Sequence, residues 1–152
     1  MNFLCDSNLI SELMKPEPHE MVEKWFSHQD FILMSAVSVE EIYYGLTYKD
    51  ARKKWAWFEN FVQSRCEVLP VTTDIAKQCG ILRGQFRLQG ITRSQADLLI
   101  GATALLYELV LVTRNTKDFE GCGIQLFNPF EEPKKDGKSK VDKTTTKTTT
   151  TD

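Results

Sequence analysis

Residues 94–118 read SQADLLIGATALLYELVLVTRNTKD, and they describe a helix, a strand and a polar loop in succession. The part up to Tyr107 is apolar and rich in small residues, which predicts a helix. Leu109 to Val112 is a continuous apolar run, typical of a central strand in a parallel sheet. Such a strand needs helices on both faces of its sheet, so this stretch favours an α/β fold.

The rest of the chain repeats this alternation of short apolar runs and helical spacing, which indicates a parallel sheet covered on both faces. Pro70 interrupts one of the runs and predicts an edge strand, because proline cannot donate to the strand ladder. We expect strands at residues 3–5, 31–34, 68–71, 109–112 and 124–127, with helices at about 7–14, 21–27, 38–46, 50–64, 72–90 and 94–107.

The length of 152 residues and the 41% hydrophobic content predict one globular domain, which we place at residues 1–132. Residues 133–152 are a Lys/Thr-rich tail with almost no apolar side chains. Such a segment cannot bury enough surface to offset its ordering entropy, so the sequence predicts a disordered tail.

The net charge of −2 conceals an uneven distribution. Residues 134–152 carry six Lys and three Asp, which leaves a charge of −5 on residues 1–133. An acidic body does not attract nucleic acid through its net field. Any binding of a polynucleotide would therefore depend on local basic clusters or on a bound cation.

The cysteines and the hydropathy pattern indicate a cellular compartment. The four cysteines are far apart and form no C-x-x-C pair, which suits reduced intracellular thiols better than disulfides or a zinc site. No apolar run approaches the roughly 20 residues that cross a bilayer, and no signal peptide opens the sequence. We expect a cytoplasmic protein with no membrane partner.

Acidic side chains stand at the ends of apolar runs or at the starts of helices. Asp6 follows the run 3–5, Glu41 and Asp97 lie early in predicted helices, and Asn115 and Asp118 follow the run 109–112. Ligands bind outside the carboxyl ends of parallel strands. Carboxylates gathered there repel by roughly 4 kcal/mol at about 4 Å in an effective dielectric near 20. A divalent metal with oxygen ligands would relieve that repulsion.

Each of these residues also has an ordinary structural explanation. Asp6 suits a helix N-cap, and Ser38 followed by Glu41 has the spacing of a capping box. Asn115 and Asp118 are common turn residues. Asp97 is harder to explain, because a carboxylate in an apolar helix costs several kcal/mol unless it is paired or bound to a metal. The joint occurrence of all five favours a metal-dependent phosphodiesterase.

Four sequence blocks and a closing motif carry a family resemblance. In this order they resemble PIN-domain ribonucleases, in particular the VapC-type toxins of bacterial toxin–antitoxin pairs. The blocks are LCDSNLISEL (4–13), LMSAVSVEEIYYG (33–45), QADLLIGATA (95–104) and VTRNTKDF (112–119), closing on FNPF (127–130).

The resemblance implies a three-layer α/β sandwich whose parallel sheet has the strand order 3-2-1-4-5. It implies a Mg²⁺ or Mn²⁺ site from Asp6, Glu41 and Asp97, with Asp118 or Asn115 as the fourth member. It also implies cleavage of RNA and inhibition by a small cognate antitoxin, and we expect a homodimer. Some family members have Asp where Asn115 stands, so the resemblance leaves two candidates for the fourth ligand: Asn115, or Asp118 through water with Asn115 positioning it.

Two further points come from the blocks. Ser7 replaces the more usual Thr, a small change. The segment EIYYG, residues 41–45, matches the family block residue by residue, which selects Glu41 over Glu40 as the site carboxylate.

Other functions and roles stay open at this level. A phosphate-accepting signalling domain fits poorly, because the third predicted strand offers no Asp before Asp74. A catalytically silent PIN-like partner-binding module is the stronger alternative, although all the carboxylates are present. His19 and His28 fall in the second predicted helix, where surface roles are expected. Four arginines either hold an RNA backbone or form a solvated face: Arg83, Arg87, Arg93 and Arg114.

Overall fold

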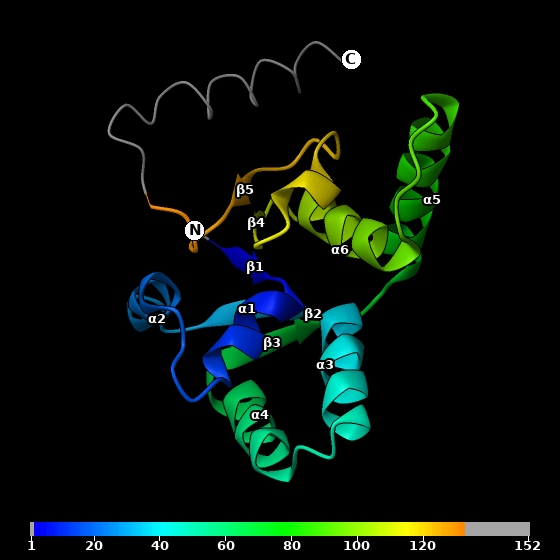
Figure 1. The fold of residues 1–152 in the computed structure, drawn as a ribbon. Helices are drawn as coiled ribbons and strands as arrows, with labels where there is room; N and C mark the ends of the chain where they lie inside the picture. The colour runs from blue at the N-terminus through cyan, green and yellow to red at the C-terminus, as the bar shows by residue number, and fades with distance from the viewer. Residues whose placement is uncertain (1, 133–152) are drawn as a thin grey trace.

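A computed structural model describes residues 2–132, and within them five strands form one parallel sheet (Figure 1). The strand order is β3-β2-β1-β4-β5 and all four pairings are parallel, so the predicted order is confirmed. The strands are β1 (Phe3–Cys5), β2 (Ile32–Ser35), β3 (Cys66–Leu69), β4 (Val110–Val112) and β5 (Leu126–Phe127).

Helices connect the strands, as parallel pairing requires. The described residues contain α1 (Ser7–Leu13), α2 (Glu20–Ser27), α3 (Ala36–Tyr48), α4 (Arg52–Arg65), α5 (Thr73–Leu88), α6 (Gln95–Leu106) and the 3₁₀ turn η1 (Thr116–Phe119). Within these residues no helix is both long and apolar enough to cross a membrane. The disorder predicted for residues 133–152 concerns residues outside those described.

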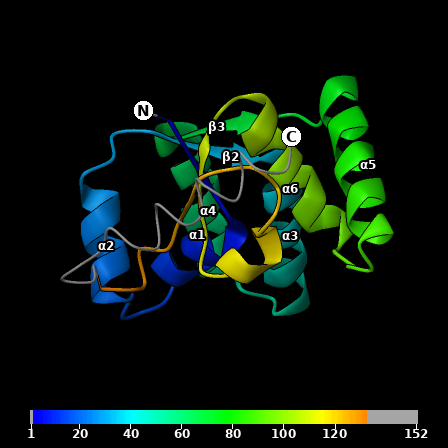
Figure 2. The same cartoon turned by 90° about the horizontal axis from the view of Figure 1, so that it is seen from above.

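The sheet separates two apolar clusters, because successive side chains of a strand point to opposite faces. Leu4 and Leu111 face a cluster that α5 and α6 complete. Cys5 and Val112 face a second cluster formed with α1, α2, α3 and α4. The two views of the ribbon show α5 and α6 on one side, away from α1 and α2 (Figures 1 and 2). The result is the predicted three-layer arrangement.

Some element boundaries differ from those predicted. The strand expected at 68–71 is β3, which begins at Cys66 directly after α4 because Cys66 pairs with Ile32 of β2. β3 ends before Pro70 and lies at an edge of the sheet, as the proline predicted. His19 and His28 are the N-cap and C-cap residues of α2, not members of the helix, and both are exposed.

Arg65 ties the end of α4 to the connection between α2 and β2. Its guanidinium donates to the carbonyl oxygens of Phe26 (3.2 Å), Gln29 (2.5 Å) and Asp30 (3.2 Å). The carbonyls of Gln29 and Asp30 follow α2, and the Phe26 carbonyl in its last turn also accepts from the Gln29 amide (3.0 Å). One side chain therefore holds three carbonyl groups at the end of α2 next to the end of α4.

We expect Arg65→Met to lower the free energy of unfolding by about 3 kcal/mol, because several hydrogen bonds from a charged donor are lost at once. Urea unfolding followed by circular dichroism measures this change. Arg52→Met is the matched control, since Arg52 is exposed and its pair with Asp50 is worth little. Equal stability of the two variants would contradict the role of Arg65.

Candidate active site

Asp6 is the buried centre of the carboxyl edge, directly after the middle strand β1. The residue is only 5% exposed. Oδ1 accepts from the Ser7 amide (2.8 Å), and Oδ2 accepts from the Thr113 hydroxyl (2.8 Å) and the Asn8 side chain (3.2 Å). Asp6 is thus the N-cap of α1 and also bonds to the residue that follows β4. The capping role and the site role fall on the same carboxylate.

Asn8 and Thr113 extend this network to the loop after β4. The Asn8 Nδ2 also lies 3.3 Å from the Thr113 hydroxyl, and its Oδ1 accepts from the Arg114 amide (3.2 Å). The Thr113 hydroxyl accepts from the Asn115 amide (3.0 Å). Neither Asn8 nor Thr113 is among the site residues predicted from the sequence. The available signal for Thr113 was its place directly after the central strand, beside the end of β1.

Glu41 faces Asp6 from the second turn of α3. The Ser7 hydroxyl donates to Glu41 Oε1 (3.3 Å), whereas Glu40 is exposed. The predicted capping box with Ser38 is wrong, because α3 begins at Ala36 and Ser35 caps it by accepting from the Val37 amide. Ser38 lies inside the helix and is fully buried. Capping therefore does not explain Glu41.

Asp97 and Asp118 approach the same edge from α6 and η1. Ser94 caps α6 and accepts from the Asp97 amide (3.1 Å), which places the half-buried Asp97 in the first turn. Asp118 is exposed, and its amide donates to the Asn115 carbonyl (3.1 Å). Asn115 is also exposed and precedes η1. The backbone bond links the two candidates for the fourth site member.

The pKa shifts show that these carboxylates influence one another. Burial raises the pKa of Asp6, and the charge of Asp97 raises it further against three hydrogen bonds that lower it. Burial and the charge of Asp6 raise the pKa of Glu41. Burial and the charge of Asp118 raise the pKa of Asp97. Desolvation and like charge therefore act together at this edge.

The donor chemistry of this edge fits a hard divalent cation. Within residues 2–132 the ion pairs are Lys15 with Glu12 and Arg52 with Asp50, so no side-chain cation is paired with the acidic cluster. In the same part of the chain, no three Asp, Glu, His or Cys side chains are close enough to enclose one ion. Mg²⁺ needs no such cage, since it binds through one or two carboxylates and keeps several waters.

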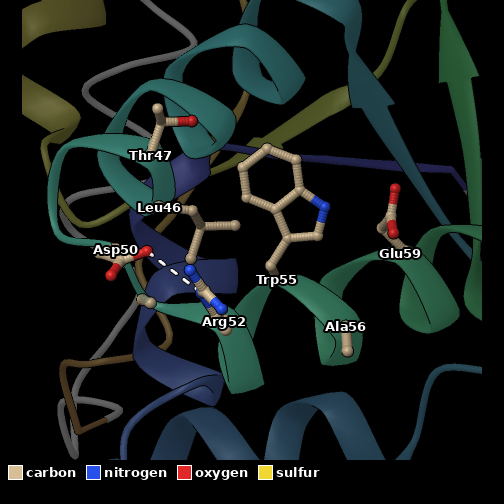
Figure 3. A pocket seen from close by; sticks show the side chains of 8 residues that line it. Leu46, Thr47, Asp50, Arg52, Trp55, Ala56 and Glu59 are labelled. Carbon is tan, nitrogen blue, oxygen red and sulfur yellow. Dashed lines mark hydrogen bonds and ion pairs between the residues drawn. The ribbon is translucent and has the colours of Figure 1, made fainter.

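One pocket of the described residues lies away from this edge. It has a volume of about 290 Å³ and sits at the C-terminal end of α3, beside the start of α4 (Figure 3). Trp55 lies along it, and Asp50 and Arg52 form an exposed ion pair at its edge. None of the predicted site residues lines this pocket. The presence of a pocket therefore does not identify the candidate active site.

The sheet order and the acidic edge together define an α/β protein of the PIN type. The family model described as PIN domain matches residues 3–121, and the chain belongs to this family. The VapC ribonuclease Y4jK of Sinorhizobium fredii is 33% identical over 136 residues, covering 84% of this chain and 97% of that protein. Toxin FitB of Neisseria gonorrhoeae is 29% identical over 137 residues, covering 85% and 99%. The crystal structure of FitAcB from the same organism matches with a TM-score of 0.74 and 29% identity, covering 86% of this chain and 99% of that chain.

We expect Asp97→Asn to be at least as stable as the parent at pH 7 in EDTA. The folded-state pKa of Asp97 lies above its ordinary value of 3.8, so the folded state binds the proton more tightly than the unfolded state. That contribution favours folding at low pH and is lost as pH rises through the folded-state pKa. The stability that Asp97→Asn gains over the parent should therefore appear at pH 7 and vanish below pH 3.8.

Melting temperatures between pH 3 and pH 8 test this expectation. Asp74→Asn is the matched control, because Asp74 lies exposed in the first turn of α5. A loss of stability in Asp97→Asn that grows from pH 3 to pH 7 would show that the Asp97 charge is stabilised in the metal-free protein.

Proposed function

We propose that this protein is a metal-dependent endoribonuclease that acts as the toxin of a type II toxin–antitoxin pair. The observation that supports this most is the convergence of Asp6, Glu41, Asp97 and Asp118, from four separate segments, on the carboxyl edge of the sheet. Membership of the PIN domain family and the likeness to a VapC ribonuclease support the same function.

Asp6, Glu41 and Asp97 would hold Mg²⁺ or Mn²⁺ through one or two direct carboxylate bonds and the waters of the ion, with Asp118 also binding through water and Asn115 positioning Asp118. When bound, such an ion lowers the pKa of a bound water and neutralises charge that develops on the scissile phosphate. Asp6 is the fixed member, because three hydrogen bonds hold its buried carboxylate. Glu41 and Asp97 are half-buried, so either one can orient the attacking water and accept its proton.

The alternative of a catalytically silent partner-binding module is less well supported. Such a module would have no need of an acidic edge whose members raise one another's pKa. The signalling-domain alternative lacks its acceptor, because β3 ends at Leu69 with no Asp before Asp74.

A small antitoxin and a second copy of the chain are the proposed protein partners, acting in the cytoplasm. An antitoxin that presents Arg or Lys to the carboxylates would form charge-assisted bonds with the oxygens that hold the cation. For the homodimer, α3 offers Tyr44 and Tyr48, which stack at 6.4 Å and are 69% and 82% exposed. Exposed aromatic pairs of this kind are typical of interaction surfaces.

We expect Glu41→Gln to reduce RNA cleavage by about 100-fold or more, because loss of even an outer-shell partner of a metal costs roughly 10- to 100-fold. Glu40→Gln should change little, since Glu40 is exposed. The assay is cleavage of total cellular RNA in Mg²⁺, Mn²⁺ or EDTA, with mapping of the new ends. Cleavage that persists in EDTA and in Glu41→Gln would refute the metal mechanism.

We expect dimers at micromolar concentration in light scattering, and co-purification of the antitoxin only while its basic segment is intact. A competition assay tests whether the antitoxin and the cation bind the same carboxylate oxygens. If both occupy the acidic edge, added Mg²⁺ should weaken binding of the antitoxin. Monomers throughout the concentration range would contradict the homodimer. Antitoxin binding that ignores both Mg²⁺ and the basic segment would contradict the inhibition model.

A further inference from the structure

Two arginines near the acidic edge each lie over a phenylalanine ring. The Arg93 guanidinium carbon is 4.8 Å from the centroid of the Phe86 ring, and that of Arg114 is 4.5 Å from the centroid of the Phe130 ring. Stacking on a ring holds a guanidinium in one plane and leaves its in-plane N–H donors available. This geometry suits the capture of an anion.

Arg93 precedes the N-cap of α6 and lies beside Asp97. Burial and the charge of Asp118 raise the pKa of Asp97, and the charge of Arg93 lowers it. The Arg93 side chain is half-buried, and its Nη1 is shielded from solvent without a hydrogen-bond partner among residues 2–132. A shielded charged donor without an acceptor is costly. The N-terminus of α6 adds a second attraction for an anion at this place.

Arg114 lies in the loop after β4, where its backbone is fixed on both sides. Its amide donates to the Asn8 side chain (3.2 Å), and its carbonyl accepts from the Asn128 side chain (3.4 Å). Phe130, under the guanidinium, also packs edge-on against His19 at 5.3 Å. The guanidinium of Arg114 therefore lies on the α1 and α2 side of the sheet. The backbone of Arg114 is bonded to Asn8, which is also bonded to Asp6.

The two guanidinium groups belong to opposite layers of the fold. Phe86, under Arg93, is part of the apolar cluster of α5 and α6. Phe130, under Arg114, packs against the cluster of α1 to α4. Figure 1 shows these layers on either side of the strands that carry the acidic edge. One arginine therefore stands on each side of the carboxylates.

A comparison with Arg65 shows why these two arginines differ from the others. The donors of Arg65 are occupied by three backbone carbonyls, which makes it a structural residue. Arg83 and Arg87 are exposed on α5 without a stacking ring among the described residues. Arg93 and Arg114 combine a fixed plane with a place beside the site.

We propose that Arg93 and Arg114 bind the phosphates of a single RNA strand on the two sides of the acidic edge. The proposal rests on the proposed function, since it assigns the residues that position the substrate for cleavage. The body of the protein carries −5 over residues 1–133, so phosphate binding needs cations fixed at chosen points. Each guanidinium offers charge-assisted and often bidentate bonds to a phosphate.

The test measures binding of a fluorescent 12-nucleotide single-stranded RNA by anisotropy across a series of KCl concentrations. The measurements use the Glu41→Gln background in EDTA, so that no cleavage occurs under the proposed function and one negative charge is removed. Arg93→Gln and Arg114→Gln should each weaken binding by about tenfold and reduce the salt slope by about 0.7, the value for one phosphate contact on a single strand. Arg52→Gln, which removes an exposed arginine at the start of α4, should change neither quantity.

Arg93→Lys separates charge from stacking. It should keep the salt slope of the parent but bind more weakly, because an ammonium lacks the planar fork. A purely structural role would change the melting temperature and leave the salt slope unchanged. Arg114 is exposed, so Arg114→Gln tests the proposal even if Arg93→Gln does not fold.

The outcomes separate this proposal from the proposed function. The assignment of Arg93 and Arg114 would be overturned if the salt slopes of both glutamine variants equalled that of Arg52→Gln. It would also be overturned if the Glu41→Gln background protein did not bind the RNA. Loss of slope in both variants supports it whether or not the parent cleaves RNA in Mg²⁺. Unchanged slopes alongside Mg²⁺-dependent cleavage by the parent would reject the two arginines and leave the ribonuclease intact.

Discussion

The burial of one carboxylate, Asp6, is the constraint on which the rest of the site depends. Asp6 as a residue is 5% exposed, and burial of its carboxylate costs several kcal/mol unless other donors replace the lost water. Ser7, Asn8 and Thr113 provide those donors. Because Thr113 lies 107 residues from Asp6 along the chain, the same bonds hold the ends of β1 and β4 together. The acidic site and the middle of the sheet are therefore stabilised by one network.

Helix starts bring the other carboxylates to this edge. α3 begins directly after β2, and α6 begins where the charge of Asp97, in its first turn, acts on Asp6 at the end of β1. Ser35 and Ser94 cap these helices through their hydroxyl groups. Glu41 projects from the second turn of α3 and Asp97 from the first turn of α6, and repulsion between them and Asp6 is the consequence. The fold thus stores like charge at a place where only a cation, or a cationic partner, relieves it.

The two stacked arginines fit this electrostatic arrangement. A positive side chain bonded directly to the carboxylates would occupy the oxygens that a cation needs. Phe86 and Phe130 instead hold Arg93 and Arg114 beside the cluster, at 4.8 and 4.5 Å from their ring centroids. The positive charge is kept close to the edge, and the described residues show no ion pair between these arginines and the acidic cluster.

The sequence by itself determined the α/β class, the positions of most strands and the identity of the acidic residues, because apolar runs and helical spacing are local properties of the chain. The choice of Glu41 over Glu40 came from the family block, and the structure places Glu41 beside Ser7. Only the tertiary structure decided that Ser35, and not Ser38, caps α3. Both serines are common N-cap residues. Ser35 becomes the cap because β2 ends at this residue and the helix follows directly.

The tertiary structure also decided the roles of Thr113 and of the arginines. A hydrogen bond between residues more than 100 positions apart leaves no periodic signal in the chain, so the part of Thr113 in the site could not be inferred from its neighbours. Arg65, Arg93 and Arg114 are the same residue type in sequence. They differ in what lies within reach of the guanidinium: three carbonyls for the first and an aromatic ring for each of the others. Contacts of that kind exist only after the layers have packed.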